Sequence, residues 1–292
     1  MGEIFLHNGS LTAGIDPAAG GSISRLQSLG AGEITNWLRP ADYQTLADGD
    51  PLGMASFPLV PFSNRIRDGK FSFQGKAVTL PLNFGDHPHV IHGHGWQNGW
   101  SVENRSITSL ELSYQHNADD WPWSYGARQV FSLTETALTI EISVANSSDS
   151  DMPVGLGLHP YFPRTPGATI TADVQQMWQV DEEVMPLELV TVEAPADPRS
   201  GLDVNSVVLD NGFTGWDGRA EISWPERDRK LVMTASGQMD QLVIFTPPGE
   251  DFFCVEPVSH GTDAVNADAE DRGVVVLEPG QTMSAEVKFE LV

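Results

Sequence analysis

Glycine and proline are spread so evenly along this chain that they leave little room for helices. The sequence contains 28 Gly and 20 Pro in 292 residues, and few windows of about 12 residues, the length of an ordinary helix, lack both. Each interior glycine costs a helix about 1 kcal/mol relative to alanine, and each proline about 3 kcal/mol. The chain is therefore expected to fold mainly from strands and turns.

Apolar and polar residues alternate in several segments, as they do in antiparallel strands with one buried face. The alternation has a period of two over residues 110–114, 138–144 and 285–291. Residues 242–245 and 252–255 are instead continuously apolar, which predicts strands that are buried on both faces.

Short polar and glycine-containing sequences mark turns between these strands. Asp68-Gly69 and Gln74-Gly75 flank residues 71–73, which predicts a hairpin. Asn211-Gly212 and Asp217-Gly218 predict further chain reversals. Because no repeat, linker or low-complexity segment divides the chain, we expect one all-β domain of stacked antiparallel sheets over residues 1–292.

The charge balance limits the partners of the protein. The chain carries 40 Asp and Glu against 16 Lys and Arg, a formal net charge of −24. Such a surface repels nucleic acid and anionic membranes, so neither is expected as a partner. A neutral small molecule is the simpler expectation for a substrate.

Cysteine content and terminal sequence predict a cytoplasmic location. Cys254 is the one cysteine in the sequence, so no disulfide can form within the chain, which fits a reducing compartment. The N-terminus lacks the basic start and apolar core of a signal peptide. No apolar run reaches the roughly 18 residues of a membrane span.

Two segments combine glycine or proline with polar side chains suited to binding. Asn64 and Arg65 follow the apolar stretch 57–62; Arg65 could hold sugar hydroxyls through its five donors or cap backbone carbonyls at a loop end. Four histidines fall within residues 87–94, which is compatible with a metal site, with ligand contact or with a polar loop. The metal interpretation lacks a close carboxylate, since Glu103 lies nine residues beyond His94.

Three further side chains could take part in acid–base chemistry. His159 lies among apolar and aromatic residues, where it is either a general acid or base or a core histidine bonded to a carbonyl. Glu256 follows an apolar strand and precedes a proline, so it is either a strand end in solvent or a buried base with a raised pKa. Asp210 could be an ordinary turn residue, and the nearby Trp216 could offer an apolar face to a sugar ring.

In this order, the segments resemble the aldose 1-epimerase (galactose mutarotase) family. The resemblance rests on Asn64-Arg65, Gly69, His92-Gly93 with Trp100, His159-Pro160-Tyr161-Phe162, Asp210-Asn211-Gly212-Phe213 and Glu256-Pro257. It implies a galactose mutarotase-like β-supersandwich with an open cleft, and an isomerase that interconverts the α and β anomers of a free aldose without a cofactor or a metal.

The resemblance also implies a role for each matching residue. Glu256 corresponds to the general base and His159 to the general acid. Arg65, His92 and Asp210 correspond to substrate-binding residues, with Asn64 beside them. The implied partner is a small sugar, bound by a monomer or a homodimer.

Two departures from the family pattern leave the substrate open. His94 stands where many members have glycine, and residues 259–266 resemble a bacterial branch whose physiological sugar is often unassigned. A hexose-6-phosphate 1-epimerase and a non-catalytic carbohydrate-binding protein of the same fold are the alternatives. A glycosidase would need two carboxylates at the scissile bond, and Asp210 is a poor second to Glu256.

Overall fold

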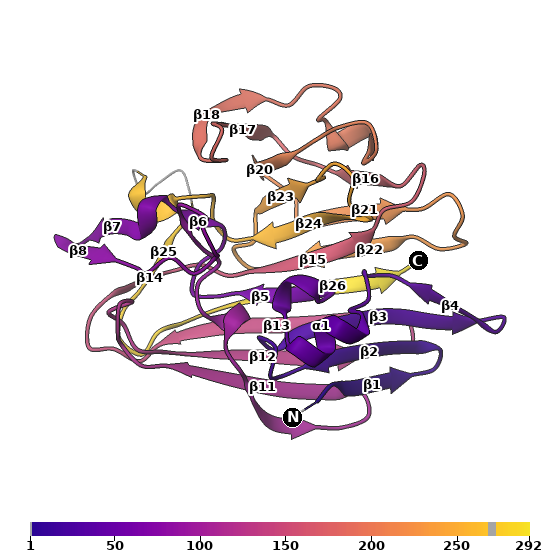
Figure 1. Cartoon of the computed structure of the whole chain (residues 1–292), viewed down its shortest axis with the longest axis horizontal. Helices are drawn as coiled ribbons and strands as arrows, with labels where there is room; N and C mark the ends of the chain where they lie inside the picture. The colour runs from indigo at the N-terminus through magenta and orange to yellow at the C-terminus, as the bar shows by residue number, and fades with distance from the viewer. Residues whose placement is uncertain (1, 268–272) are drawn as a thin grey trace.

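The computed structural model describes residues 2–267 and 273–292, and it is built almost entirely from strands, as predicted. Two large sheets dominate, and each pair of named strands in the described residues is antiparallel. In Figure 1 the strands of both sheets run roughly horizontally, from β1 near the bottom to β18 at the top. The predicted all-β fold of stacked antiparallel sheets is confirmed.

The larger sheet has eleven strands and the smaller one nine. From edge to edge, the larger sheet contains β1 (Ile4–Asn8), β2 (Leu11–Asp16), β3 (Ser22–Gly30), β5 (Ser56–Leu59), β15 (Gly157–Pro163), β24 (Phe252–Val258), β23 (Gln241–Phe245), β20 (Asp210–Thr214), β17 (Gln176–Val180) and β18 (Pro186–Thr191), with β4 (Glu33–Asn36) paired to β3. The smaller sheet contains β10 (Ser101–Arg105), β11 (Ser109–His116), β12 (Tyr125–Leu133), β13 (Ala137–Asn146), β26 (Thr282–Leu291), β22 (Leu231–Ala235), β21 (Arg219–Ser223), β16 (Thr169–Ala172) and β19 (Leu202–Asp203).

Short elements complete the fold around these sheets. Three two-stranded pairs are formed by β6 (Arg65–Ile66) with β9 (Val90–Ile91), β7 (Lys70–Phe73) with β8 (Lys76–Thr79), and β14 (Met152–Val154) with β25 (Val275–Leu277). The helical elements are α1 (Tyr43–Asp48) and the single 3-10 turns η1 (Pro51–Gly53), η2 (Arg67–Gly69), η3 (Gly95–Gln97), η4 (Pro198–Ser200) and η5 (Ala264–Asn266). Within the described ranges, we find no helix with the length and apolar character needed to cross a membrane.

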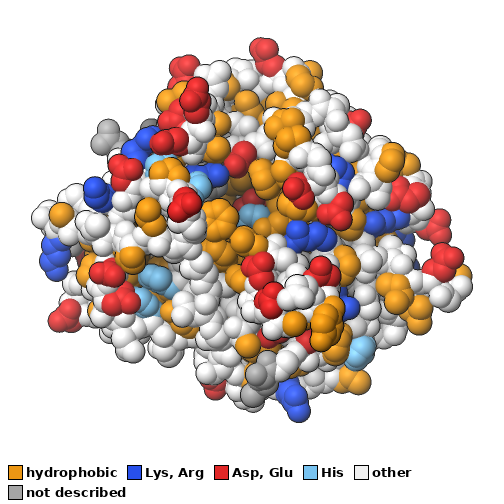
Figure 2. All heavy atoms as spheres, in the orientation of Figure 1, with side chains coloured by type: hydrophobic (Ala, Val, Ile, Leu, Met, Phe, Trp, Pro, Cys, Tyr) orange, Lys and Arg blue, Asp and Glu red, His pale blue; other side chains and the backbone are white. Residues whose placement is uncertain are grey.

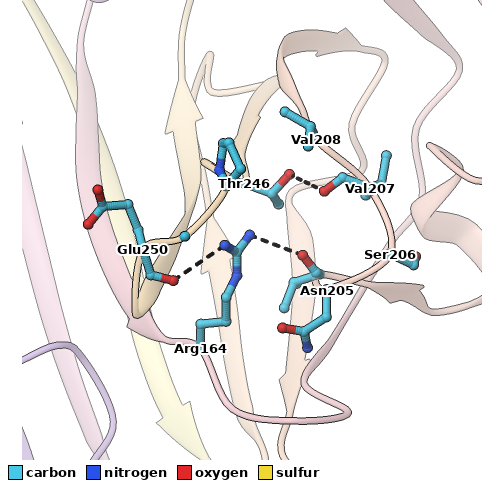
Figure 3. Close-up of a pocket in the computed structure, with 10 residues that line it drawn as sticks. Arg164, Asn205, Ser206, Val207, Val208, Thr246 and Glu250 are labelled. Carbon is cyan, nitrogen blue, oxygen red and sulfur yellow. Dashed lines mark hydrogen bonds between the residues drawn. The ribbon is translucent and has the colours of Figure 1, made fainter.

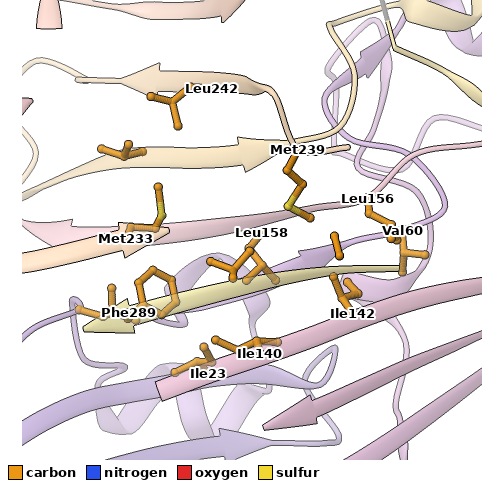
Figure 4. Packing of buried hydrophobic residues seen from close by; sticks show 14 of the residues in the cluster. Ile23, Val60, Ile140, Ile142, Leu156, Leu158, Met233, Met239, Leu242 and Phe289 are labelled. Atoms are coloured by element: carbon orange, nitrogen blue, oxygen red, sulfur yellow. The ribbon is translucent and has the colours of Figure 1, made fainter. Parts of the chain in front are cut away.

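The main core fills the space between the two large sheets. Ile140 and Ile142 of β13 and Phe289 of β26 point into it from the smaller sheet, and Leu158 and Leu242 meet them from the larger one (Figure 4). Each such side chain is fully or almost fully buried, which contributes about 1.5–3 kcal/mol to folding. The predicted period-two strands over 138–144 and 285–291 therefore owe their stability to one shared core.

The middle strands of the larger sheet are buried on both faces, as their continuous apolar sequences predict. In β23 and β24, Ile244 and Val255 belong to the main core, whereas their neighbours Val243 and Cys254 belong to a second cluster. This second cluster also contains Phe57, Leu59, Trp96, Tyr161 and Val258. The face of the larger sheet that points away from the smaller sheet is thus also apolar and buried, and it forms the floor of the candidate site.

The predicted turns are confirmed in two cases and wrong in one. Gln74 and Gly75 join β7 to β8 with φ values of +47° and +78°, as a two-residue hairpin turn requires. Gly218, with φ of +82°, bends the connection between β20 and β21. Asn211 and Gly212 lie inside β20 instead, because they pair with Ile244 and Val243 of β23. The Asn211 amide also donates to the carbonyl of Trp178 at 2.9 Å.

Candidate active site

His159 and Glu256 are brought together by the pairing of β15 with β24. Gly157 pairs with Val258 and Tyr161 with Cys254, so the same register sets His159 opposite Glu256. Nε2 of the imidazole lies 3.3 Å from Oε1 of the carboxyl group. Both side chains are at least nine-tenths buried, and they share the sheet face that carries the second apolar cluster. Two buried ionisable side chains are thus held within hydrogen-bond reach of each other.

Aromatic rings enclose the imidazole of His159. Phe57, directly opposite on β5, stacks on it with centroids 4.6 Å apart, and Tyr161 stacks at 4.7 Å. Burial lowers the pKa of His159 to about 3, and burial, followed by the charge of Asp210, raises the pKa of Glu256 well above its usual value. Both directions favour the uncharged forms of the two side chains.

Arg65 and Asp210 form a second pair at the edge of the same pocket. Asp210 begins β20, and its Oδ2 accepts from Nη2 of Arg65 at 3.0 Å. Oδ1 of Asn64 accepts from Nη1 of Arg65 at 3.1 Å and from its backbone N–H at 2.9 Å. The buried Nε of Arg65 has no protein partner among the described groups. The guanidinium is therefore fixed in place and keeps donors for a ligand.

His92 presents its outer nitrogen to the pocket because its inner nitrogen is occupied. Asn64 N–H donates to His92 Nδ1 at 3.1 Å, and His92 N–H donates to the Asn64 carbonyl at 2.9 Å. Since Nδ1 accepts, the proton of the neutral ring is assigned to Nε2. Both residues have positive φ, +56° for Asn64 and +63° for His92. Such a backbone is uncommon for residues with side chains and is often found at functional sites.

All six predicted site residues line one pocket of about 160 Å³. The polar side chains are those of Asn64, Arg65, His92, His159, Asp210 and Glu256. The remaining lining is apolar or aromatic and comes from Leu52, Phe57, Phe84, Ile91, Tyr161 and Phe245. Figure 2 shows a hollow near the centre of this face, ringed by hydrophobic side chains, with a histidine at its bottom.

The apolar lining residues were not predicted as site residues. Phe245 follows from the register, because it pairs with both Asp210 and Cys254, but that register cannot be read from the sequence. Trp216, considered as a sugar-facing ring, lies in the main core, and its indole N–H donates to the Arg219 carbonyl at 2.9 Å. Among the clustered histidines 87, 89, 92 and 94, His92 is the one that lines the pocket.

A larger pocket, of about 450 Å³, lies beside the loops 204–208 and 246–250 (Figure 3). Its polar side chains are bonded to its own walls. Arg164 donates to the carbonyls of Val204 at 3.0 Å and Glu250 at 3.4 Å, and Thr246 donates to the carbonyl of Val207 at 2.9 Å. The smaller pocket, where His159 and Glu256 meet, is therefore the stronger candidate for an active site.

Known proteins resemble this chain in both sequence and fold. The sequence profile of the aldose 1-epimerase family matches residues 4–290. The chain belongs to the aldose 1-epimerase family. It is 32% identical to the uncharacterised Escherichia coli K12 protein YphB over 265 residues, which cover 84% of this chain and 88% of YphB.

The solved structures of two similar proteins have the same fold as this chain. A candidate aldose 1-epimerase of Escherichia coli K12 superposes with a TM-score of 0.90 at 30% identity, covering 99% of this chain and 98% of that one. A galactose mutarotase-like protein from Clostridium acetobutylicum superposes with a TM-score of 0.89 at 21% identity, covering 99% and 95%. The predicted galactose mutarotase-like fold is confirmed.

Proposed function

We propose that this protein interconverts the α and β anomers of a free aldose by opening and reclosing the sugar ring. The observation that carries the proposal is the pair of His159 and Glu256, 3.3 Å apart and buried at the floor of a pocket. Membership of the aldose 1-epimerase family supports the same reaction class. Glu256 is proposed as the base, His159 as the acid, and Arg65, His92, Asp210 and Asn64 as groups that bind and orient the sugar.

Ring opening needs two proton transfers on one hemiacetal. Glu256, as a carboxylate, accepts the proton of the C1 hydroxyl, while His159, as an imidazolium, donates a proton to the ring oxygen. The C1–O5 bond breaks, a C1 aldehyde forms, and the C1–C2 bond rotates. Reclosure on the other face reverses both transfers, so no net proton is gained or lost. A positioned acid or base contributes roughly 10²–10⁴-fold to the rate.

The charge state of the pair changes in step with this reaction. Burial favours a protonated Glu256 and a neutral His159, which is the state of the pair after the ring has opened. A bound sugar donates a hydroxyl hydrogen bond to Glu256 and accepts one at its ring oxygen from His159. These bonds stabilise the carboxylate and imidazolium that ring opening requires.

Pocket size and charge favour a free monosaccharide as the substrate. A volume of about 160 Å³ is below the roughly 300–1,000 Å³ of pockets for drug-sized ligands, and it suits one ring. Arg65 is the one Lys or Arg among the lining residues, and Asp210 already pairs with it. Burial also lowers the pKa of His92 well below its usual value. A sugar phosphate would find no unpaired cation here.

A polarimetric screen of freshly dissolved α-anomers tests the proposal. Several free aldoses and glucose 6-phosphate are compared, with mutarotation in buffer as the baseline. We expect accelerated mutarotation of at least one free aldose. A tenfold preference in kcat/KM for the phosphate, worth about 1.4 kcal/mol, would support the hexose-6-phosphate alternative. Sugar binding without acceleration of any anomerisation would support the non-catalytic alternative.

A further inference from the structure

We propose that His260 is a positioning residue that holds the loop bearing Asn64 and Arg65 in its sugar-binding conformation. The inference rests on the proposed function, because it concerns how the same pocket is kept in shape. His260 does not line the pocket, and it would act through the backbone of Ser63.

The ring of His260 is fixed through both of its nitrogens. Ser63 N–H donates to Nε2 at 3.0 Å, and Nδ1 lies 2.8 Å from the carbonyl of Gly261. A carbonyl only accepts, so Nδ1 carries the proton and Nε2 is the acceptor. The residue is 3% exposed, so bulk water does not reach the Ser63 N–H while the ring is in place. Loss of this acceptor would leave a buried donor next to Asn64 unpaired.

The residues after His260 bind the same loop at further points. Asp263 N–H donates to the Arg65 carbonyl at 2.8 Å, and Asp263 Oδ1 accepts from the Arg67 N–H at 3.0 Å. Asn266 then donates to the Lys70 carbonyl at 2.8 Å. This segment directly follows β24, the strand that carries Glu256. The chain therefore connects the proposed base to the loop of Arg65, with His260 as the first contact.

Gly155 leaves the space that the His260 ring occupies. A methyl group at Gly155 would overlap Cδ2 and Nε2 of that ring, the atoms on the side that accepts from Ser63. Gly155 N–H also donates to the Pro61 carbonyl at 2.7 Å, so it is joined to the same loop. The φ of Gly155 is not positive, and an alanine backbone is therefore permitted there. Gly155→Ala should displace the ring without removing it.

The first experiment compares His260→Ala with His260→Gln and with His116→Ala as a matched control. His116 is also a buried histidine, but it lies on β11. Its described hydrogen bonds, ion pair and ring contacts are with Trp121, Asp119, His94 and Tyr125, which lie outside the 63–68 loop. We expect His260→Ala to raise KM for the sugar about tenfold, while kcat changes by less than about threefold. His260→Gln places an amide oxygen near the position of Nε2 and should restore most of the affinity. His116→Ala should leave KM within about twofold, although both alanine variants lower the melting temperature.

A double-mutant cycle separates positioning from general destabilisation. Gly155→Ala alone should raise KM about as much as His260→Ala. The double variant should be no worse than His260→Ala alone, because the smaller side chain removes the overlap. Additive losses, or an unchanged KM in folded His260→Ala, would overturn the proposal.

Hydrogen exchange gives a readout that does not depend on activity. We expect the amides of Ser63 and Asn64 to exchange about tenfold faster in His260→Ala and Gly155→Ala than in wild type or His116→Ala. If wild type anomerises no sugar, the proposed function fails, and this measurement still decides the anchoring of the loop. Unchanged exchange would overturn the anchoring, even in an active enzyme.

Discussion

The imidazole rings of His94 and His116 are stacked, with centroids 4.4 Å apart and an angle of 5° between their planes, and Nδ1 of His94 is 3.0 Å from the hydroxyl of Tyr125. Protonation of both rings would bring two like charges to this short separation, which is unfavourable. Burial, followed by the nearby His116, lowers the pKa of His94 to about 4. Burial and the stack therefore favour a neutral ring at position 94.

This stack predicts a loss of stability in acid. Below pH 6.5 the unfolded chain binds a proton at His94, whereas the folded chain does not until the pH is near 4. Stability should therefore fall over that interval, by at most about 3 kcal/mol from this residue. Urea unfolding at pH 7 and pH 4.5 should show a smaller difference for His94→Gln than for wild type. His7→Gln, which removes an exposed histidine of β1, is the control.

Glu256→Gln should abolish most of the catalysis and leave sugar binding largely intact. The amide keeps the shape of the side chain but cannot accept the C1 hydroxyl proton, so kcat should fall roughly 10²–10⁴-fold. Polarimetry gives the rate, and calorimetric titration gives the affinity. A folded variant that binds sugar and turns over within about threefold of wild type would remove Glu256 as the base.

His159→Asn should lower kcat by a comparable factor, because the asparagine amide is not acidic enough to give a proton to the ring oxygen. The double variant with Glu256→Gln should lose less than the product of the two single losses, since both groups act on one bond in one reaction. Rates of all three variants in the same anomerisation assay test this. Fully multiplicative losses would indicate that the two side chains act in separate steps.

Arg65→Ala should differ from both, with a clear rise in KM. The guanidinium is fixed by Asn64 and Asp210 and keeps donors for the sugar, so its removal weakens binding and orientation together. It also leaves Asp210, an acidic neighbour that already raises the pKa of Glu256, without its cation. The pH at which kcat/KM rises should therefore shift upward in Arg65→Ala. An unchanged KM would show that Arg65 does not bind the sugar.

Prolonged chelation should leave the anomerisation rate unchanged. His159, Cys254 and Glu256 place ligand atoms within 4.8 Å of one another, but burial raises the pKa of the Cys254 thiol well above its usual value, which disfavours the thiolate that binds metals. The proposed chemistry also needs proton transfer alone. Loss of activity with a chelator, restored by one divalent ion, would contradict the metal-free mechanism.

The sequence predicts the fold class and the six polar lining residues, but not how they meet. Alternation over 138–144 is a local property of the chain, and it is sufficient to predict a strand. The contact of His159 with Glu256 depends instead on the pairing of β15 with β24 and on the register of that pair. Neither the pairing nor the register of two strands so far apart in the chain can be read from a single sequence.

Local signals also fail where tertiary packing decides the outcome. Asn211-Gly212 has the composition of a turn, yet it lies within β20 because it pairs with Ile244 and Val243 of β23. Likewise, nothing in the sequence links Gly155 to His260. Only the structure shows that the His260 ring fills the space beside Gly155.

The spacing of His159 and Glu256 is set by adjacent strands in the middle of a sheet, where neighbouring backbones lie about 4.8 Å apart. Neither side chain depends on a mobile loop for its place. Heating should therefore leave the acid–base pair assembled for as long as the sheet persists, and thermal inactivation should coincide with global unfolding. Inactivation at a lower temperature than unfolding would then point to the loops that line the pocket, such as the one that carries Leu52.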